Sequence, residues 1–272
     1  MLSVRTTARL RVPIIAAVAI VLASCTIAPP RNDDPWEKFN RRMYRFNDVV
    51  DRAAIRPAAV TYRKVTGPNA RRVISNFFAN VRMPITIAND VLQGEFKDAF
   101  RNSGRFVINT TLGFAGFFDP ASQMNLTGEE TDFGITLAKW GVPEGPYLVL
   151  PLVGSSSVRD AWRMPVDSYF FDPMSMYSRK QSLRLDAEYW PSMLYLVTLR
   201  ASAIDAENLL EGAYDPYVFY RDAYRQRRLY RIYDGSPPME MMDQLQDIDD
   251  DEMEQMLQEQ YELSEPQSKP TP

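Results

Sequence analysis

Residues 34–50 read Asp-Pro-Trp-Glu-Lys-Phe-Asn-Arg-Arg-Met-Tyr-Arg-Phe-Asn-Asp-Val-Val. Asp34 can cap a helix, Pro35 suits the first helical position, and Glu37 completes a box-like arrangement. Apolar side chains then recur at steps of three and four residues, and basic side chains occupy the other sides. The segment predicts an amphipathic helix. Two interpretations stay open: a helix packed on a core with a solvated back, and an interfacial helix whose arginines meet lipid phosphates.

The sequence before this helix predicts export and lipid attachment. Three arginines precede an apolar stretch from Val12 to Ala23, which has the layout of a secretory signal peptide and is too short to span a bilayer. The sequence Leu-Ala-Ser-Cys that ends at Cys25 resembles the bacterial lipobox, in which the cysteine is acylated; the alternative is a free reactive thiol. By resemblance to bacterial lipoproteins, Thr26 in place of Asp indicates the outer membrane. We expect a lipoprotein signal peptide over residues 1–24 and a lipidated tether over residues 25–33.

Charge is distributed unevenly, and several chemistries are excluded by composition. The net charge is −4, and it becomes −7 without the three arginines of the signal peptide. Residues 25–238 carry 27 basic and 24 acidic side chains, whereas residues 239–265 carry eleven acidic and no basic ones. The absence of histidine removes the usual general base and the commonest metal ligand, and the single cysteine leaves no zinc–cysteine site. We therefore expect no catalytic residue, no metal and no cofactor apart from covalent lipid on Cys25.

Prolines and glycines divide the chain after residue 50 into short elements. Helices are predicted to begin at Pro68 and at Pro84, the second of them ending at the natural C-cap Gly94. Residues 145–152 are interrupted by prolines, which predicts an extended segment. Nowhere does the sequence after the signal peptide offer eighteen continuous apolar residues, so no simple spanning helix is expected. The remaining helical predictions are residues 95–110, residues 131–140, a short helix that ends before Asp172-Pro173, the longest helix within residues 186–212, and residues 217–233.

Residues 106–118 contain no charge and end in a cluster of phenylalanines and glycines. Burial in a core is the simplest interpretation. In a protein tied to a membrane, the alternative is a segment that dips into lipid without spanning it. We expect apolar contact with the membrane or with a lipid conduit at these residues: Phe106, Phe114, Phe117, Phe118, Tyr147 and Leu148.

Two C-terminal segments carry patterns that are typical of binding surfaces. Tyrosines and arginines alternate over residues 217–233; export disfavours nucleic-acid binding, and a bilayer surface or simple packing with a solvated basic face remain. Residues 236–272 are acidic and rich in methionine, and we expect them to be partly disordered. An acidic tail is usually solvated, but apolar side chains at near-helical spacing suit docking in the groove of a soluble partner. Leu245 and Ile248 are the residues expected to recruit that partner.

Several short phrases occur in order between residues 34 and 233 and carry a resemblance. They are Asp34-Pro35-Trp36-Glu37-Lys38-Phe39-Asn40-Arg41, Ser75-Asn76-Phe77, Leu92-Gln93-Gly94, Asn109-Thr110-Thr111-Leu112-Gly113, Asp132-Phe133-Gly134, Trp140-Gly141-Val142, Gly145-Pro146-Tyr147 and Asp215-Pro216-Tyr217. Together they resemble the MlaA (VacJ) family of outer-membrane phospholipid-trafficking lipoproteins.

The resemblance implies a mostly α fold with little strand over residues 34–235, a ring-like, monotopic assembly of short amphipathic helices embedded in the outer membrane. It implies association with trimeric porins and passage of mislocalised phospholipid from the outer leaflet to a soluble periplasmic carrier, which maintains lipid asymmetry. We then expect a lipid-anchored protein that faces the periplasm, is not an enzyme and binds no nucleic acid. A structural envelope lipoprotein that handles no lipid is the main alternative. A lipid hydrolase is the other, which the missing histidine disfavours.

Overall fold

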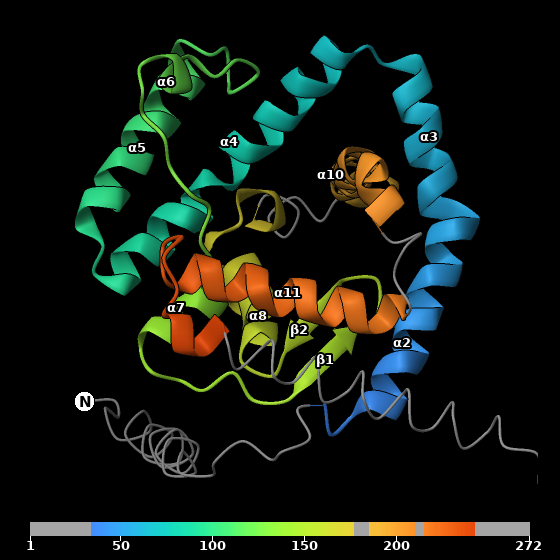
Figure 1. The fold of residues 1–272 in the computed structure, drawn as a ribbon. Coiled ribbons are helices and arrows are strands. Elements are labelled where there is room, and N and C mark those ends of the chain that lie inside the picture. Colours follow the sequence, from blue (N-terminus) through green and yellow to red (C-terminus); the bar gives the residue numbers. More distant parts are fainter. Residues whose placement is uncertain (1–33, 177–184, 210–214, 243–272) are drawn as a thin grey trace, which may run out of the picture. The chain divides into compact units, whose positions relative to one another are not determined.

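The computed structural model describes residues 34–176, 185–209 and 215–242. These residues form mostly helices and, within the described ranges, a single two-stranded sheet (Figure 1). The chain divides into two compact units, the first ending at Tyr217 and the second beginning at Val218. The predicted class, mostly helical with little strand, is confirmed. The ring and the predicted boundaries of tether, helical domain and tail stay predictions.

The first helical segment runs without a break from α2 (Glu37–Val50) through a π-helical turn, Asp51–Ile55, into α3 (Arg56–Val65). The predicted start is confirmed, but the predicted cap is wrong, because no side chain caps α2. The Asp34 carboxylate instead accepts hydrogen bonds from the amide of Asn40 (2.8 Å) and from the hydroxyl of Tyr217. Asp34 therefore ties the start of α2 to a distant part of the chain.

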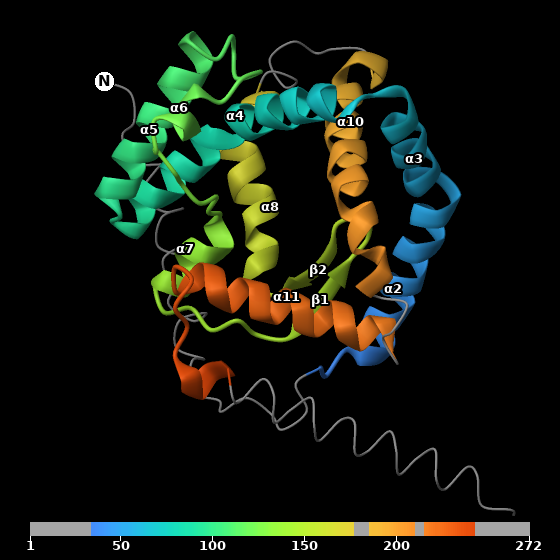
Figure 2. The same ribbon diagram turned by 45° about the horizontal axis from the view of Figure 1, so that its top comes forward.

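The longest described helix is α4 (Pro68–Gln93), with 26 residues. The start at Pro68 and the end at Gly94, which has φ +79°, are confirmed. The predicted break at Pro84 is wrong. A proline inside a helix removes one backbone hydrogen bond, but α4 is held on both sides of it by packing against α5 (Phe96–Thr111), with Met83 and Ile85 buried. The two helices run antiparallel (Figures 1 and 2).

A short hairpin follows the helix α7 (Phe133–Lys139). Strands β1 (Tyr147–Leu150) and β2 (Gly154–Ser157) pair antiparallel, with Tyr147 opposite Ser157 and Leu150 opposite Gly154. The extended segment predicted at residues 145–152 is confirmed. The chain then forms a 3-10 turn, α8 (Arg163–Val166) and a π-helical turn, which ends at Asp172 as predicted.

Helix α10 (Leu185–Ala203) lies beside α3, and a short 3-10 helix, Ile204–Leu209, follows it (Figure 2). Ala59, Tyr62 and Ala201 are buried between them. Arg200 binds the carboxylate of Asp51 with two nitrogens, both at 2.8 Å. The prediction that this helix is the longest is wrong, because it has 19 residues. The remaining described elements are α6 (Pro120–Gln123) and α11 (Pro216–Ile232).

The second unit contains the part of α11 that follows Tyr217, together with residues up to 242. Asp215 accepts a 2.8 Å hydrogen bond from the backbone N–H of Tyr217, and α11 agrees within one residue at each end with the predicted helix at residues 217–233. Across the ranges that the structure describes, no helix combines the length and apolar character that crossing a membrane requires.

Candidate functional site

The predicted lipid-contact segment divides into two parts. Residues 106–111 form the last turns of α5, and residues 112–118 form a compact loop, here called the phenylalanine loop. Phe114 and Ala115 have φ of +53° and +58°, in the left-handed region that costs an L-residue about 1–2 kcal/mol. Such strain persists where surrounding contacts over-determine it, and it is found at binding and active sites.

The loop is tightly packed rather than loosened by its glycines. A Cβ on Gly113 would lie 2.4 Å from the carbonyl oxygens of Asn109 and Phe118, and one on Gly116 would lie 2.4 Å from Cβ of Asn80. The backbone N–H of Gly116 donates to the Asn109 carbonyl at 2.8 Å. The two glycines therefore allow close approach of the loop to α4 and α5.

This packing separates the phenylalanines into anchors and exposed rings. Phe117 is half-buried and stacks on Phe77 of α4, with ring centroids 4.9 Å apart and planes 17° apart. Phe114 is 74% exposed, and Phe118 is also exposed. Phe106 is partly buried. The loop therefore uses one ring to hold itself on α4 and presents two others to the surroundings.

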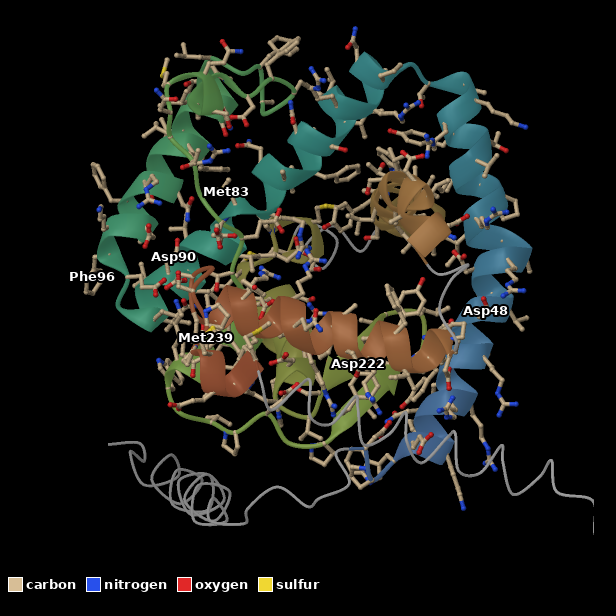
Figure 3. The ribbon with its side chains drawn as sticks, in the orientation of Figure 1. Asp48, Met83, Asp90, Phe96, Asp222 and Met239 are labelled. Atoms are coloured by element: carbon tan, nitrogen blue, oxygen red, sulfur yellow. The ribbon has the colours of Figure 1, made fainter. Side chains whose placement is uncertain are left out.

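The exposed rings continue along the outer face of α5. Phe96 extends away from the helix (Figure 3). Phe100 is 82% exposed and Val107 is also exposed, and their helical spacing places them on the same face as Phe96. Large exposed apolar side chains in a continuous row mark a surface that contacts another apolar phase or partner. We call the row of Phe96, Phe100, Val107, Leu112, Phe114 and Phe118 the α5 apolar row. Phe96 and Phe100 were not among the residues predicted to contact lipid, although their spacing of four residues places them on one helix face.

Tyr147 and Leu148, predicted to share this surface, lie in strand β1 instead. Tyr147 is only 1% exposed, its hydroxyl is 2.8 Å from that of Ser155, and its ring meets the edge of Tyr217. Leu148 is partly buried. Tyr147 presents no surface to lipid in this structure, and β1 is not part of the α5 apolar row.

A second exposed apolar face belongs to α2. Trp36, Phe39, Phe46 and Val49 are all exposed, and the exposed Arg42 and Arg45 lie beside them. The buried side of the helix carries polar Asn40. Met43 and Val50, which belong to the predicted stripe, are half-buried, so the helix packs part of its apolar side and exposes the rest. An exposed apolar stripe flanked by arginines is typical of a helix at a lipid–water interface.

Two asparagines on the buried side of α2 bind the hairpin. Asn40 donates to the Tyr147 carbonyl (3.0 Å) and accepts from the Val149 N–H (2.9 Å). Asn47, two helical turns later, donates to the Leu150 carbonyl (2.9 Å) and accepts from the Leu152 N–H (2.7 Å). Each side-chain amide makes the pair of hydrogen bonds that the backbone of a neighbouring strand would make, so α2 binds the edge of β1 that does not pair with β2. The repeated Phe-Asn at residues 39–40 and 46–47 was the sequence signal for this pair, and its role was missed.

Buried polar side chains connect α4 to α5, to α7 and to the π-helical turn that begins at Asp167. Asn89 donates to Asp167 at 3.0 Å and accepts from Thr136 at 2.7 Å, and Asn102 donates to Asp90 at 2.7 Å. Figure 3 places Asp90 where α4 meets α5. Burial raises the pKa of Asp90 and of Asp167 to about 6, although the asparagine hydrogen bonds oppose the rise. Buried hydrogen bonds of this kind fix the relative positions of the helices that carry them.

The family model for the MlaA lipoprotein matches residues 32–231, which is most of the chain. The chain belongs to the MlaA lipoprotein family. It is 34% identical over 260 residues to the intermembrane phospholipid transport system lipoprotein MlaA of Escherichia coli K12, covering 89% of this chain and 99% of that protein. It is 31% identical over 228 residues to the protein of the same name in Haemophilus influenzae, covering 80% and 88%.

Two further relatives of this MlaA family member extend the comparison. An uncharacterized protein of Rickettsia prowazekii is 36% identical over 196 residues, covering 72% of this chain and 76% of that protein. A solved structure concerned with the maintenance of bacterial outer membrane lipid asymmetry matches with a TM-score of 0.62 and 36% identity, covering 72% of this chain and 96% of the solved one. The resemblance inferred from the sequence phrases is therefore confirmed.

Three predicted site residues of this family member lie outside the described residues. They are the lipidation site Cys25 and the tail residues Leu245 and Ile248. Within the ranges that are described, no group of three or more acidic, histidine or cysteine side chains is placed to hold a metal ion.

Proposed function

We propose that this protein is an outer-membrane lipoprotein that removes mislocalised phospholipid from the outer leaflet and passes it toward a soluble periplasmic carrier, maintaining lipid asymmetry. The α5 apolar row carries this proposal. Exposed phenylalanines on a rigid, strained loop give a membrane protein an apolar surface at fixed positions. No helix in the described residues is long and apolar enough to cross a membrane. The names of the Escherichia coli and Haemophilus influenzae relatives support the same conclusion.

The chemistry of the exposed faces suits contact with one leaflet. Apolar area removed from water contributes roughly 25 cal/mol per Å², and an arginine near an anionic surface about 1 kcal/mol. The α5 apolar row supplies the first term, and the arginines beside the α2 stripe supply the second. In this proposal covalent lipid on Cys25 provides the permanent anchor, the protein faces the periplasm, and the two faces set its depth in the leaflet.

Association with a trimeric porin and recruitment of the periplasmic carrier by the acidic tail are further parts of the proposal. Replacing Leu245 and Ile248 together by Asp is expected to abolish carrier binding while membrane association is retained. Replacing Ser264 and Ser268 by Asp is the matched control, because it adds the same charge to the tail without removing apolar side chains. Unchanged carrier binding by the Leu245→Asp, Ile248→Asp variant would remove these residues from the account.

The direct test is the lipid content and activity of the purified, full-length protein. We expect phospholipid to copurify and to move from labelled vesicles to the carrier, with no chemical change to the lipid. A purified protein that carries and moves no phospholipid would support the structural-lipoprotein alternative. Appearance of lysophospholipid during incubation would contradict the expectation that the protein is not an enzyme.

A further inference from the structure

A small pocket lies between the end of α3, the first turns of α4 and the end of α10. It is not part of the apolar faces described for the proposed function. Its volume is about 120 Å³. One water needs roughly 10–15 Å³ of such volume, so the pocket admits a group of the size of a phosphate but not an acyl chain. It is lined by Tyr62, Arg63, Arg71, Ser75, Thr198, Ala201, Ser202 and Asp205.

Its strongest donors are two guanidinium groups with unused N–H groups. Nη1 of Arg63 binds the Asp205 carboxylate at 2.8 Å, and Nη1 of Arg71 donates to the carbonyls of Arg63 (3.1 Å) and Thr66 (2.6 Å). These contacts fix both side chains and occupy one nitrogen of each. An arginine has five N–H donors, so Nε and Nη2 of both residues stay available. Two fixed forks of this kind are suited to the oxygens of a phosphate.

Tyr62 supplies the observation that points to a ligand. Its side chain is only 8% exposed, and its hydroxyl has no hydrogen-bond partner. A buried polar group without a partner is costly and is rare in folded proteins. The side chain is part of the pocket lining, and its hydroxyl, which is shielded from solvent in the empty pocket, would gain a partner once a small shift of the lining brought it against an acceptor on a ligand. Ser75, one turn after Arg71 on α4 and exposed at the surface, is a further hydroxyl donor there.

The remaining polar groups set the selectivity. The hydroxyls of Thr198 and Ser202 already donate to carbonyls of α10, at 2.8 and 2.7 Å, so they act toward a ligand as acceptors. Asp205 is the one carboxylate in the lining, and its side chain is 77% exposed. Two arginines against one exposed carboxylate give the pocket a net charge of +1. The N–H groups of Arg63 and Arg71, which their hydrogen bonds hold in place, outnumber the acceptor oxygens around them, and this favours binding of an anion.

We infer that this pocket binds a phosphate group. The group is either the phosphodiester of a lipid headgroup or free phosphate, which share the same acceptor oxygens. If it belongs to a lipid, the pocket is a headgroup subsite of the phospholipid transport proposed above, and that part of the inference rests on it. Binding of phosphate in the pocket does not depend on transport.

Calorimetric titration of the full-length, lipidated protein in an uncharged detergent at constant ionic strength tests the inference. The probes are inorganic phosphate and dihexanoylphosphatidylglycerol. Saturable binding of either probe is expected, weakened about ten-fold or more by Tyr62→Phe, since one hydrogen bond to a charged group is lost. Tyr195→Phe, a change of the same size on α10 outside the lining, is expected to leave the affinity unchanged.

A second variant predicts a change in the opposite direction. Asp205→Asn removes the carboxylate that competes for Arg63, so phosphate affinity is expected to rise by roughly five-fold, as for loss of an exposed ion pair. Asp98→Asn, which removes a half-exposed carboxylate that is paired with Arg101, is the matched control. Tighter binding of the lipid probe than of phosphate identifies a headgroup, and the reverse identifies free phosphate. Absence of saturable binding, or equal affinities of wild type, Tyr62→Phe and Asp205→Asn, would overturn the inference.

The outcome is separable from that of the proposed function. If the protein moves phospholipid from vesicles to the carrier but binds neither probe in this pocket, the phosphate-site inference is wrong and the transport proposal stands. If the protein binds phosphate in this pocket but moves no phospholipid, the transport proposal is wrong and the phosphate-site inference stands.

Discussion

Asn40 and Val149 are 109 residues apart in the chain, yet the side-chain oxygen of Asn40 accepts a 2.9 Å hydrogen bond from the backbone N–H of Val149. The same amide donates to the carbonyl of Tyr147 and to Asp34. One fully buried side chain thus joins the start of α2, the edge of β1 and the residue that precedes the first helix. Asn40 makes these contacts from the buried side of α2, whereas Trp36, Phe39 and Phe46 of the apolar stripe are exposed.

Replacing Asn40 by Ala is expected to lower the free energy of unfolding by about 3 kcal/mol. The change removes three hydrogen bonds and leaves the buried N–H of Val149 and the carbonyl of Tyr147 without partners, at about 1–3 kcal/mol for each unsatisfied group. Urea unfolding followed by circular dichroism measures the effect. Arg42→Ala, on the exposed side of the same helix, is expected to change the stability by less than about 0.5 kcal/mol. Equal effects of the two changes would contradict the role of Asn40.

Replacing Phe114 by Gly is expected to separate stability from function. Glycine accepts the left-handed conformation that Phe114 adopts at φ +53°, so stability is expected to stay the same or rise by about 1 kcal/mol. Transfer of phospholipid is expected to fall because an exposed ring of the α5 apolar row is lost. Ala115→Gly relieves the same kind of strain at φ +58° without removing a ring. Normal transfer by Phe114→Gly, or an equal loss in Ala115→Gly, would count against lipid contact at Phe114.

Asp90 is expected to make stability fall as the pH rises through the range from about 4 to 6. Burial raises the pKa of this carboxyl to about 6 from its ordinary value of 3.8, so the folded protein holds the proton more tightly than the unfolded chain. Protonation therefore favours folding, and this contribution is fully present at low pH and is lost above the raised pKa. The change is measured by unfolding at a series of pH values.

Asp90→Asn is expected to remove the contribution of Asp90 to that dependence, while that of Asp167 remains, and to stabilise the protein by about 1 kcal/mol at pH 7.5, with no gain at pH 4. The new amide can donate to Oδ1 of Asn102, which has no partner in the structure. Glu129→Gln, an exposed acid, is the control and is expected to change little. A destabilised Asp90→Asn variant at pH 7.5 would show that the ionised carboxylate is the favoured form.

Local signals in the sequence predicted the ends of several elements correctly. Gly94 follows α4 with a φ of +79°, and α11 begins at Pro216, one residue before the predicted start. Where these helices begin and end depends on the backbone conformations open to one or two residues, glycine or proline, and a local sequence pattern therefore predicts it. Pro84 misled the prediction because the packing of α4 on α5 outweighs the local preference of one proline. Asp34 misled it because a carboxylate at a helix start can serve a distant tyrosine instead of the helix.

Only some of the residues predicted to contact lipid are exposed in the structure, and the geometry of a helix explains why the sequence did not separate them. Periodicity identifies an apolar face, but it does not say whether that face meets protein or lipid. Phe114 and Phe118 were predicted to contact lipid and are exposed; Tyr147 is of similar character and is buried. The Asn40 and Asn47 contacts join residues more than a hundred positions apart, and no local pattern contains such information.

The central claim is most directly tested by the phospholipid content of the outer leaflet in cells that lack this protein. The account predicts accumulation of phospholipid there, rescued by the wild-type chain and not by Cys25→Ala, which removes the expected site of lipidation. Protein levels of the two chains are to be matched by immunoblot. An unchanged outer leaflet in the deletion strain would contradict the account and would favour a structural lipoprotein that does not handle lipid.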